Sequence, residues 1–226
     1  FLYHSLRLFN SKNIIKIIAI TNSVKKYLIK KHKVDKKKVD IIPSASDLKL
    51  RFKKFNLKKN YKIGYFGSLD KSKGSEFIIR LSKLDKENQY YIYGGDLKAV
   101  LNLKKKFFFK NLNIFEYVPY NRLSHFIDKM DIVLMPSNRN KLKSIGGVGN
   151  ISKYTSPVKL FDYLASGKLI ISSRLKVFEE IIKDKENCIM IKKLNPESWL
   201  KIIRNLKNRL NEINGIKKNA LLLSKN

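Results

Sequence analysis

The chain has 226 residues and a formal net charge of +31, because 49 lysines and arginines outnumber 18 acidic residues. Only eight of the basic residues are arginines, the lysines are spread along the whole chain, and no zinc-ligand spacing or helix-turn-helix pattern accompanies them. The composition therefore argues against a sequence-specific nucleic-acid-binding protein. The single cysteine excludes an intramolecular disulfide, and no apolar run approaches the length needed to span a bilayer.

The first 45 residues are too few to bury a hydrophobic core of their own. The sequence opens on Phe1 without an initiator methionine, so we expect a piece of a longer protein. Residues 25–33 (KKYLIKKHK) and 103–110 (LKKKFFFK) set apolar side chains among lysines, as interfacial helices do. Contact with an anionic membrane is one interpretation, and ordinary surface helices with an apolar face toward the core are the favoured one.

From residue 61 onward, strand and helix patterns alternate with short connections. This alternation predicts a parallel sheet covered by helices on both faces, an α/β fold whose ligands bind at the carboxyl ends of the strands. We expect strands at residues 61–66, 89–93, 112–116, 131–135, 168–172 and 188–191, and helices at 75–85, 96–107, 120–129, 157–166, 175–183, 196–213 and 216–224. Asn195 is expected to cap the helix that Pro196 begins, and Gly215 to separate the last two helices.

Residues 61–74 (YKIGYFGSLDKSKG) combine a buried strand, a turn at Gly67, Lys73 and the start of a helix. In that arrangement, backbone amides and a lysine amine can approach a phosphate group together. Similar strand–glycine–helix turns also occur in α/β proteins for packing reasons alone, so the segment is a weak signal when taken by itself.

Residues 156–167 (SPVKLFDYLASG) form the most informative segment. Pro157 suits a first helical turn, and Gly167 can take the left-handed conformation that ends helices. The free amides at the start of this helix would suit a diphosphate, and the carboxylate of Asp162 could accept hydrogen bonds from sugar hydroxyls. The alternative is a capped core helix with a solvated aspartate.

The longest irregular stretch, residues 137–155, contains three glycines between 146 and 149. A loop of this length inside a compact domain is usually functional or disordered. A mobile flap over a donor sugar and plain disorder are equally good interpretations of it.

The remaining reactive side chains indicate little further chemistry. Cys188 lies in an apolar run and is expected to be a buried, unpaired thiol in a reducing cytosol. No grouping of histidines and carboxylates has metal-ligand spacing, so neither a metal site nor any other cofactor is expected.

Taken together and in order, these segments resemble the donor-binding half of a GT-B glycosyltransferase of the family four type. The resemblance covers roughly residues 14–193 and is most specific in residues 156–167. It implies a Rossmann-like, doubly wound parallel sheet. It also implies that residues 1–45 are the remnant of an acceptor domain with its crossover, that 46–215 form the nucleotide-sugar donor domain, and that 216–226 form a C-terminal helix.

The resemblance implies a retaining transfer of a hexosyl-type sugar from a nucleotide-diphosphate sugar to a glycan or lipid-linked acceptor, in surface polysaccharide biosynthesis. The enzyme would work in the cytoplasm, with peripheral contact to the inner face of the membrane. Lys73 and the turn at Gly67 and Ser68 would hold the diphosphate, and Asp162 the ribose. The backbone at Tyr117 and Val118 would contact the base, and the amides of Val158, Lys159 and Leu160 would face the phosphates.

Three positions depart from the family's pattern. Ser68 stands where the family commonly has an arginine, which leaves Lys71 or Lys159 to substitute as a second cation. Tyr154 stands at the family's first acidic position, where the sugar hydroxyls are recognised, and Asp162 replaces the second acid, a glutamate. These departures support an alternative, a catalytically inactive GT-B-like binding or scaffold protein. On its own, the chain is expected to bind donor weakly without turnover.

Overall fold

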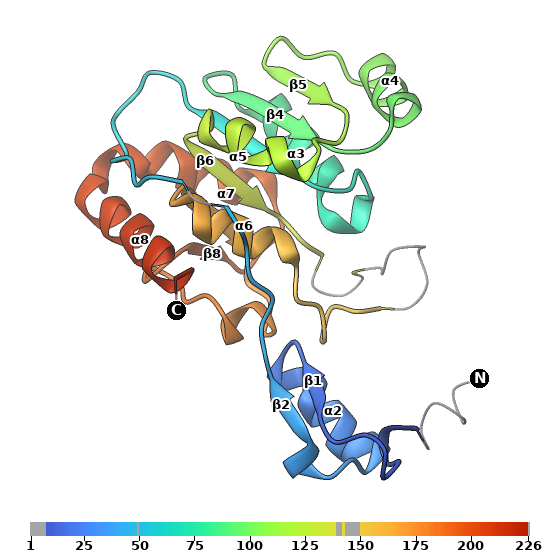
Figure 1. Ribbon diagram of the computed structural model, residues 1–226. Coiled ribbons are helices and arrows are strands. Elements are labelled where there is room, and N and C mark those ends of the chain that lie inside the picture. The colour runs from blue at the N-terminus through green and yellow to red at the C-terminus, as the bar shows by residue number, and fades with distance from the viewer. Residues whose placement is uncertain (1–7, 49, 139–141, 143–149, 226) are drawn as a thin grey trace.

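The computed structural model describes residues 8–48, 50–138, 142 and 150–225, and Figure 1 shows its arrangement. A small N-terminal unit pairs β1 (Ile17–Ala19) in parallel with β2 (Val39–Ile41), with α2 (Asn22–His32) packed against them. Its core consists of Ala19, Leu28, Val34 and Val39. No described helix is long and apolar enough to cross a membrane.

The larger unit contains a six-stranded sheet in which all neighbouring strands are parallel, in the order β5-β4-β3-β6-β7-β8. Chain order reverses between β3 and β6, which makes the fold doubly wound and places a ligand crevice at the carboxyl ends of these two strands. The predicted fold class is confirmed. The strands are β3 (Lys62–Phe66), β4 (Gln89–Tyr93), β5 (Leu112–Phe115), β6 (Ile132–Met135), β7 (Leu169–Ser173) and β8 (Ile189–Ile191).

Helices bury both faces of this sheet, which is why its strands are almost continuously apolar. Along β6, Ile132 and Leu134 pack into one core cluster while Val133 and Met135 pack into the other. The first cluster includes side chains of α3 (Ser75–Leu84), α4 (Leu97–Lys106) and α7 (Pro196–Arg204). The second includes α5 (Tyr120–Asp128) and α6 (Val158–Ser166), and α8 (Leu210–Leu223) contributes to both.

The helix predicted at residues 175–183 is wrong. Only a 3-10 turn, Phe178–Glu180, forms there. Val177, Ile181 and Ile182 are β-branched residues, which favour helix weakly. The side chains of Val177, Phe178 and Ile182 are instead buried by tertiary packing against the second core cluster.

The predicted break between the last two helices is also misplaced. Asn195 caps α7 as expected, accepting from the Ser198 amide at 2.8 Å. Helix α7 ends at Arg204 and is followed directly by a 3-10 turn, Asn205–Asn208. The helical geometry is broken at Arg209, which has φ −133° and ψ 30°. Gly215 lies inside α8, where a glycine costs only about 1 kcal/mol relative to alanine.

The crossover between the two units passes along α6 before it enters β3, as Figure 1 shows. A second contact between the units comes from Glu180, whose carboxylate accepts from the Asn22 amide at 2.7 Å at the start of α2. The units are joined near the carboxyl ends of the strands, where the crossover residue Ser46 bonds to Asp162 of α6 and Glu180 bonds to α2.

Candidate functional site

A pocket of about 200 Å³ lies at the carboxyl end of β3, against the beginning of α6. A larger, open hollow of about 620 Å³ lies beside α7, away from the strand ends, and gathers no buried ionisable group. The smaller pocket is lined by Phe66, Gly67, Tyr93, Tyr117, Val118, Tyr120, Leu123, Val158, Lys159, Asp162 and Tyr163. Six of these, Gly67, Tyr117, Val118, Val158, Lys159 and Asp162, belong to the residues predicted from the sequence.

Lys159 supplies the pocket's most unusual charge. Its Nζ is enclosed, has no hydrogen-bond partner among the described residues, and lies 4.1 Å from the centroid of the Tyr65 ring. Burial and the nearby charge of Lys73 lower the pKa of Lys159 to about 7. An unpaired buried amine is costly unless a ligand satisfies it, so this end of the pocket is suited to an anion.

The turn at Gly67 brings the backbone close to this amine. A Cβ at residue 67 would lie 2.9 Å from Lys159 Nζ, and the glycine has φ +155°. The Gly67 amide donates to the Tyr93 carbonyl at 2.9 Å, and the Tyr65 hydroxyl donates to the Ser68 carbonyl at 2.8 Å. The predicted glycine turn is confirmed, and a hydrogen bond at Gly67 and another at Ser68 fix its backbone.

Lys73 and Ser68 lie in the same connection between β3 and α3 without lining the pocket themselves. Ser68 Oγ accepts from the Asp70 amide at 3.1 Å, which stabilises the turn. Gly74, at φ +95°, is the N-cap of α3 and lies beside Pro136, where a Cβ would come within 2.5 Å of the Pro136 carbonyl oxygen. Lys71 points elsewhere, because it pairs with Glu76 at 2.9 Å.

Asp162 is buried, with 5 % of its surface exposed, and its Oδ1 accepts from Ser46 Oγ at 2.7 Å and from the Tyr120 hydroxyl at 3.3 Å. Burial raises the pKa of this carboxyl, and the bonds from Ser46 and Tyr120 oppose that rise. Tyr120 also accepts from the Asp47 amide at 3.2 Å. The crossover segment therefore supplies a hydroxyl where a sugar hydroxyl could bind.

The start of α6 has the predicted geometry with one exception. Pro157 precedes the first helical residue, Val158, and Gly167 ends the helix at φ 59°. The Leu160 amide, predicted to face a phosphate, donates instead to the Pro157 carbonyl at 2.9 Å, because the first turn is tight, and its side chain is fully buried. Phosphate contact is thus left to the two amides before it.

Tyr117 and Val118 lie beyond β5 at the other end of the pocket. The Tyr117 amide donates to the Gly95 carbonyl at 3.0 Å, which fixes the backbone there, and the Tyr117 side chain is 66 % exposed. The rings of Phe66 and Tyr93, which also line the pocket, are stacked, with centroids 4.9 Å apart and an interplanar angle of 5°. Contact with a base at this position stays a prediction.

Tyr154 is not among the residues that line the pocket. Its ring packs against Tyr27 of α2, with centroids 5.0 Å apart. The structure therefore places the Tyr154 ring against the N-terminal unit. Most of the predicted flap at residues 137–155, including its glycines at 146–149, lies outside the described residues. Among the residues that are described, no group of three or more metal-ligating side chains comes together.

Comparison with known proteins identifies the class. Residues 46–221 match the family model described as glycosyl transferases group 1, and the chain belongs to this family. The fold is that of the GT-B glycosyltransferases. No curated protein gives a significant match to the sequence.

Solved structures resemble the chain in fold at low sequence identity. A glycosyltransferase from Rickettsia africae gives a TM-score of 0.66 at 16% identity, covering 98% of this chain and 62% of that one. Anabaena Alr3699/HepE in complex with UDP-glucose gives a TM-score of 0.66 at 14% identity, covering 100% of this chain and 64% of that one. Sucrose-phosphate synthase from Thermosynechococcus elongatus gives a TM-score of 0.70 at 14% identity, covering 99% of this chain and 56% of that one. The chain thus spans about three-fifths of the length of these neighbours.

Sequence reasoning missed three residues of the site: Ser46, Tyr65 and Tyr120. Tyr65 has the pattern of a core residue on a strand, and it is indeed fully buried. Ser46 and Tyr120 lie 116 and 42 residues from the aspartate that they contact. The only sequence signal for Ser46 was its position in the crossover, and spacing along the chain carries no information about such contacts.

Proposed function

We propose that this chain forms the donor-binding half of a retaining glycosyltransferase, which transfers a hexosyl-type sugar from a nucleoside-diphosphate sugar to a glycan or lipid-linked acceptor of surface polysaccharide. One observation carries the proposal. The helix α6 presents to the same pocket a buried amine, Lys159, that has no hydrogen-bond partner among the described residues, and a buried carboxylate, Asp162. The pocket lies at the carboxyl end of β3, where the strand order of the sheet reverses. A nucleoside diphosphate complements both groups, since its phosphates are anionic and its ribose carries hydroxyls.

The chemistry follows from where negative charge develops. As the sugar leaves, charge accumulates on the nucleoside diphosphate, and donors fixed in advance around the phosphates stabilise it. Lys73, Lys159 and the first amides of α6 would provide those donors. The ribose hydroxyls would bond to Asp162 in place of Ser46, while the Tyr120 hydroxyl would continue to orient the carboxylate. The neighbouring structures contain further residues that this chain does not span. We expect the acceptor, and any catalytic residue that contacts it, to be bound or supplied by such residues. We therefore expect binding without turnover from the chain alone.

Calorimetric titration with UDP, GDP and ADP, at moderate and high salt, tests the donor site. We expect one nucleotide to bind with modest salt dependence, and Lys73→Ala and Asp162→Ala to weaken it by about 10- to 100-fold, as loss of a charge-assisted hydrogen bond predicts. Lys71→Ala is the matched control, because Lys71 is exposed and pairs with Glu76. Absence of binding to any of the three by folded protein would contradict the proposal.

The second candidate is a binding or scaffold protein without catalysis. Tyr154 favours it, because the side chain at that position packs against Tyr27 rather than lining the pocket. A folded chain that binds none of the three nucleotides would support this candidate. Tight nucleotide binding that is lost in Asp162→Ala would speak against it.

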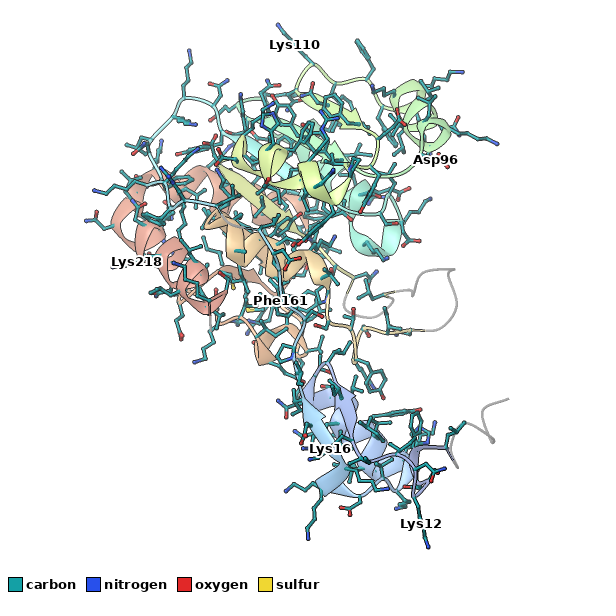
Figure 2. All side chains as sticks on the ribbon, in the orientation of Figure 1. Lys12, Lys16, Asp96, Lys110, Phe161 and Lys218 are labelled. Atoms are coloured by element: carbon teal, nitrogen blue, oxygen red, sulfur yellow. The ribbon has the colours of Figure 1, made fainter. Side chains whose placement is uncertain are left out.

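We also propose contact between the segment after α4 and an anionic membrane on the cytoplasmic side. The Phe108 side chain is 94% exposed, while Phe107 and Phe109 pack against the core. Four lysines, 104, 105, 106 and 110, surround it in the sequence, and Lys110 points away from the sheet in Figure 2. Such a pairing of an aromatic ring with cations is typical of interfacial segments.

Flotation with phosphatidylglycerol vesicles, compared with phosphatidylcholine vesicles, tests this contact. Phe108→Ser should lower binding to the anionic vesicles several-fold, whereas Leu222→Ser, on exposed α8 surface, should not. Equal binding by both variants would argue that the phenylalanine does not enter the membrane.

A further inference from the structure

The enclosed amine of Lys159 raises a question that phosphate binding alone does not answer, namely which proton state it has before a ligand arrives. Its Nζ lies over the face of the Tyr65 ring and against the Gly67 turn, where solvent is excluded. A ring face stabilises a cation only in part, and a buried ammonium without an anionic partner is unfavourable.

The ionisable groups described around this amine either repel a positive charge or are already engaged. Asp70, a carboxylate in the β3–α3 connection, acts on the Tyr65 hydroxyl and has an interaction of its own. Lys73 adds a second positive charge from the β3–α3 connection. The Tyr65 hydroxyl donates to the Ser68 carbonyl, and burial raises the pKa of Tyr65, so the phenol stays neutral. On α6 itself, the Tyr163 hydroxyl accepts from the Phe66 amide at 2.9 Å.

The nearest carboxylate on the helix does not neutralise the amine either. Asp162 bonds to the hydroxyls of Ser46 and Tyr120, both of which come from outside α6. These surroundings lower the pKa of Lys159 to about 7, so the amine is largely uncharged at slightly alkaline pH in the free protein.

We propose that Lys159 contacts the donor's diphosphate and takes up a proton from solvent as the diphosphate binds, so that donor binding and release are coupled to pH. The inference rests on the proposed donor-binding function. An arginine would be charged at every physiological pH and would show no such coupling, whereas a lysine amine changes its proton state readily when buried. No covalent step is involved: the amine gains one proton on binding and returns it on release.

The direction of the effect follows from linkage. The diphosphate favours the ammonium form, so the bound state holds more protons than the free state wherever the free amine is neutral. Donor affinity should therefore fall as the pH rises above about 7, the pKa of the free amine, by up to tenfold for each pH unit. Below that pH the amine is already charged, and affinity should level off.

Proton uptake can be measured directly by titrating the chain with UDP-glucose, or with GDP-mannose if guanine is the base that binds, in HEPES and in Tris. These sugar diphosphates carry no group of their own that titrates near neutral pH, unlike UDP or GDP. We expect uptake to approach one proton per donor at pH 8.5 and to approach zero at pH 6. Lys159→Arg should bind donor without uptake, and Lys73→Arg should retain the uptake.

Two results would overturn the inference. Binding without uptake at pH 8.5, or uptake that persists in Lys159→Arg, would show that Lys159 does not exchange the proton, while leaving the proposed function intact. Failure of the folded chain to bind any donor would remove the proposed function and the inference with it. If Lys159→Arg does not fold, Lys159→Met serves instead, with at least tenfold weaker binding and no uptake expected.

Discussion

Buried lysine amines lie at both ends of the central sheet, and they differ in whether they have a hydrogen-bond partner. At the amino ends of the strands, Lys217 Nζ donates to the Lys53 carbonyl at 2.7 Å and lies over the rings of Phe52 and Phe55. Lys168 there donates to the Asp128 carbonyl at 2.6 Å. At the carboxyl ends, Lys159 Nζ has a ring face but no hydrogen-bond partner in the described part of the chain.

The difference separates a structural lysine from a binding one. Burial is the main cause of a lowered pKa in both places, to about 8 for Lys217 and to about 7 for Lys159. The two lysines differ in their hydrogen bonds. The structural lysine, Lys217, donates to a protein carbonyl, whereas the amine of Lys159 has no protein partner among the described residues and is available to a ligand. Desolvation is therefore a poor marker of function until partners are counted.

Removing the structural lysine should cause the larger change. Lys217→Ala deletes a buried side chain whose amine lies over the rings of Phe52 and Phe55, and it removes the hydrogen bond to the Lys53 carbonyl. We expect the free energy of unfolding in urea to fall by about 2–4 kcal/mol. Lys218→Ala, an exposed neighbour on α8, should change it by about 0.5 kcal/mol or less. A loss below about 1 kcal/mol for Lys217→Ala would remove the distinction.

Removing the unpaired lysine should have the opposite sign. Lys159→Met replaces an unsatisfied amine by an apolar side chain of similar length. We expect the nucleotide-free protein to gain about 1–2 kcal/mol in free energy of unfolding at pH 7, as often happens when a binding site is removed. A destabilised variant would indicate that Lys159 holds the fold as Lys217 does.

The gain from Lys159→Met should also depend on pH. The pKa of Lys159 is lowered by folding, from 10.5 to about 7, so the unfolded chain binds more protons between these values. The lysine's contribution to stability is therefore least favourable below pH 7 and improves as the pH rises from about 7 toward 10.5. The difference between variant and parent should shrink across that range. Urea unfolding at pH 6, 8 and 9.5 measures it, and a constant difference would contradict the shift.

The smallest effect is expected at the carboxylate. Tyr120→Phe removes a hydroxyl that joins Asp162 to the Asp47 amide, while the ring remains. Nucleotide affinity should fall by about 3- to 10-fold, because the lost hydrogen bond acts on the ligand only through the position of Asp162. Tyr91→Phe, on β4 and away from the pocket lining, is the control. Tighter nucleotide binding by Tyr120→Phe would mean that this hydroxyl competes with the ligand for Asp162.

Most of the sheet was predictable because its signals are local. The short apolar runs of β3 and β6, the turn at Gly67 and the cap at Asn195 each depend on a few neighbouring residues. The errors occurred where tertiary contacts outweighed local preference. Gly215 was expected to break a helix but is carried through by the packing of Ile213 and Ile216 on the core.

The candidate site was predicted in part for the same reason. The glycine turn and the start of α6 are continuous segments, so they were found from their residues. Lys159 was one of two alternatives to the missing arginine, and only the folded chain separates it from Lys71, which turns outward to Glu76. Tyr154 was expected at the donor site, which stays a prediction, and only the folded chain shows that its ring packs on Tyr27 of α2.

The order of residues thus carries the class of fold and the two segments that build the anion end of the pocket, because hydrogen-bonded turns and helix ends form between near neighbours. The proton state of Lys159 and the partner of Asp162 depend on Tyr65 and on Ser46, which reach these groups only after the sheet and the crossover have assembled. Burial and through-space charge have no counterpart in local spacing, which is why they emerge only in the folded molecule.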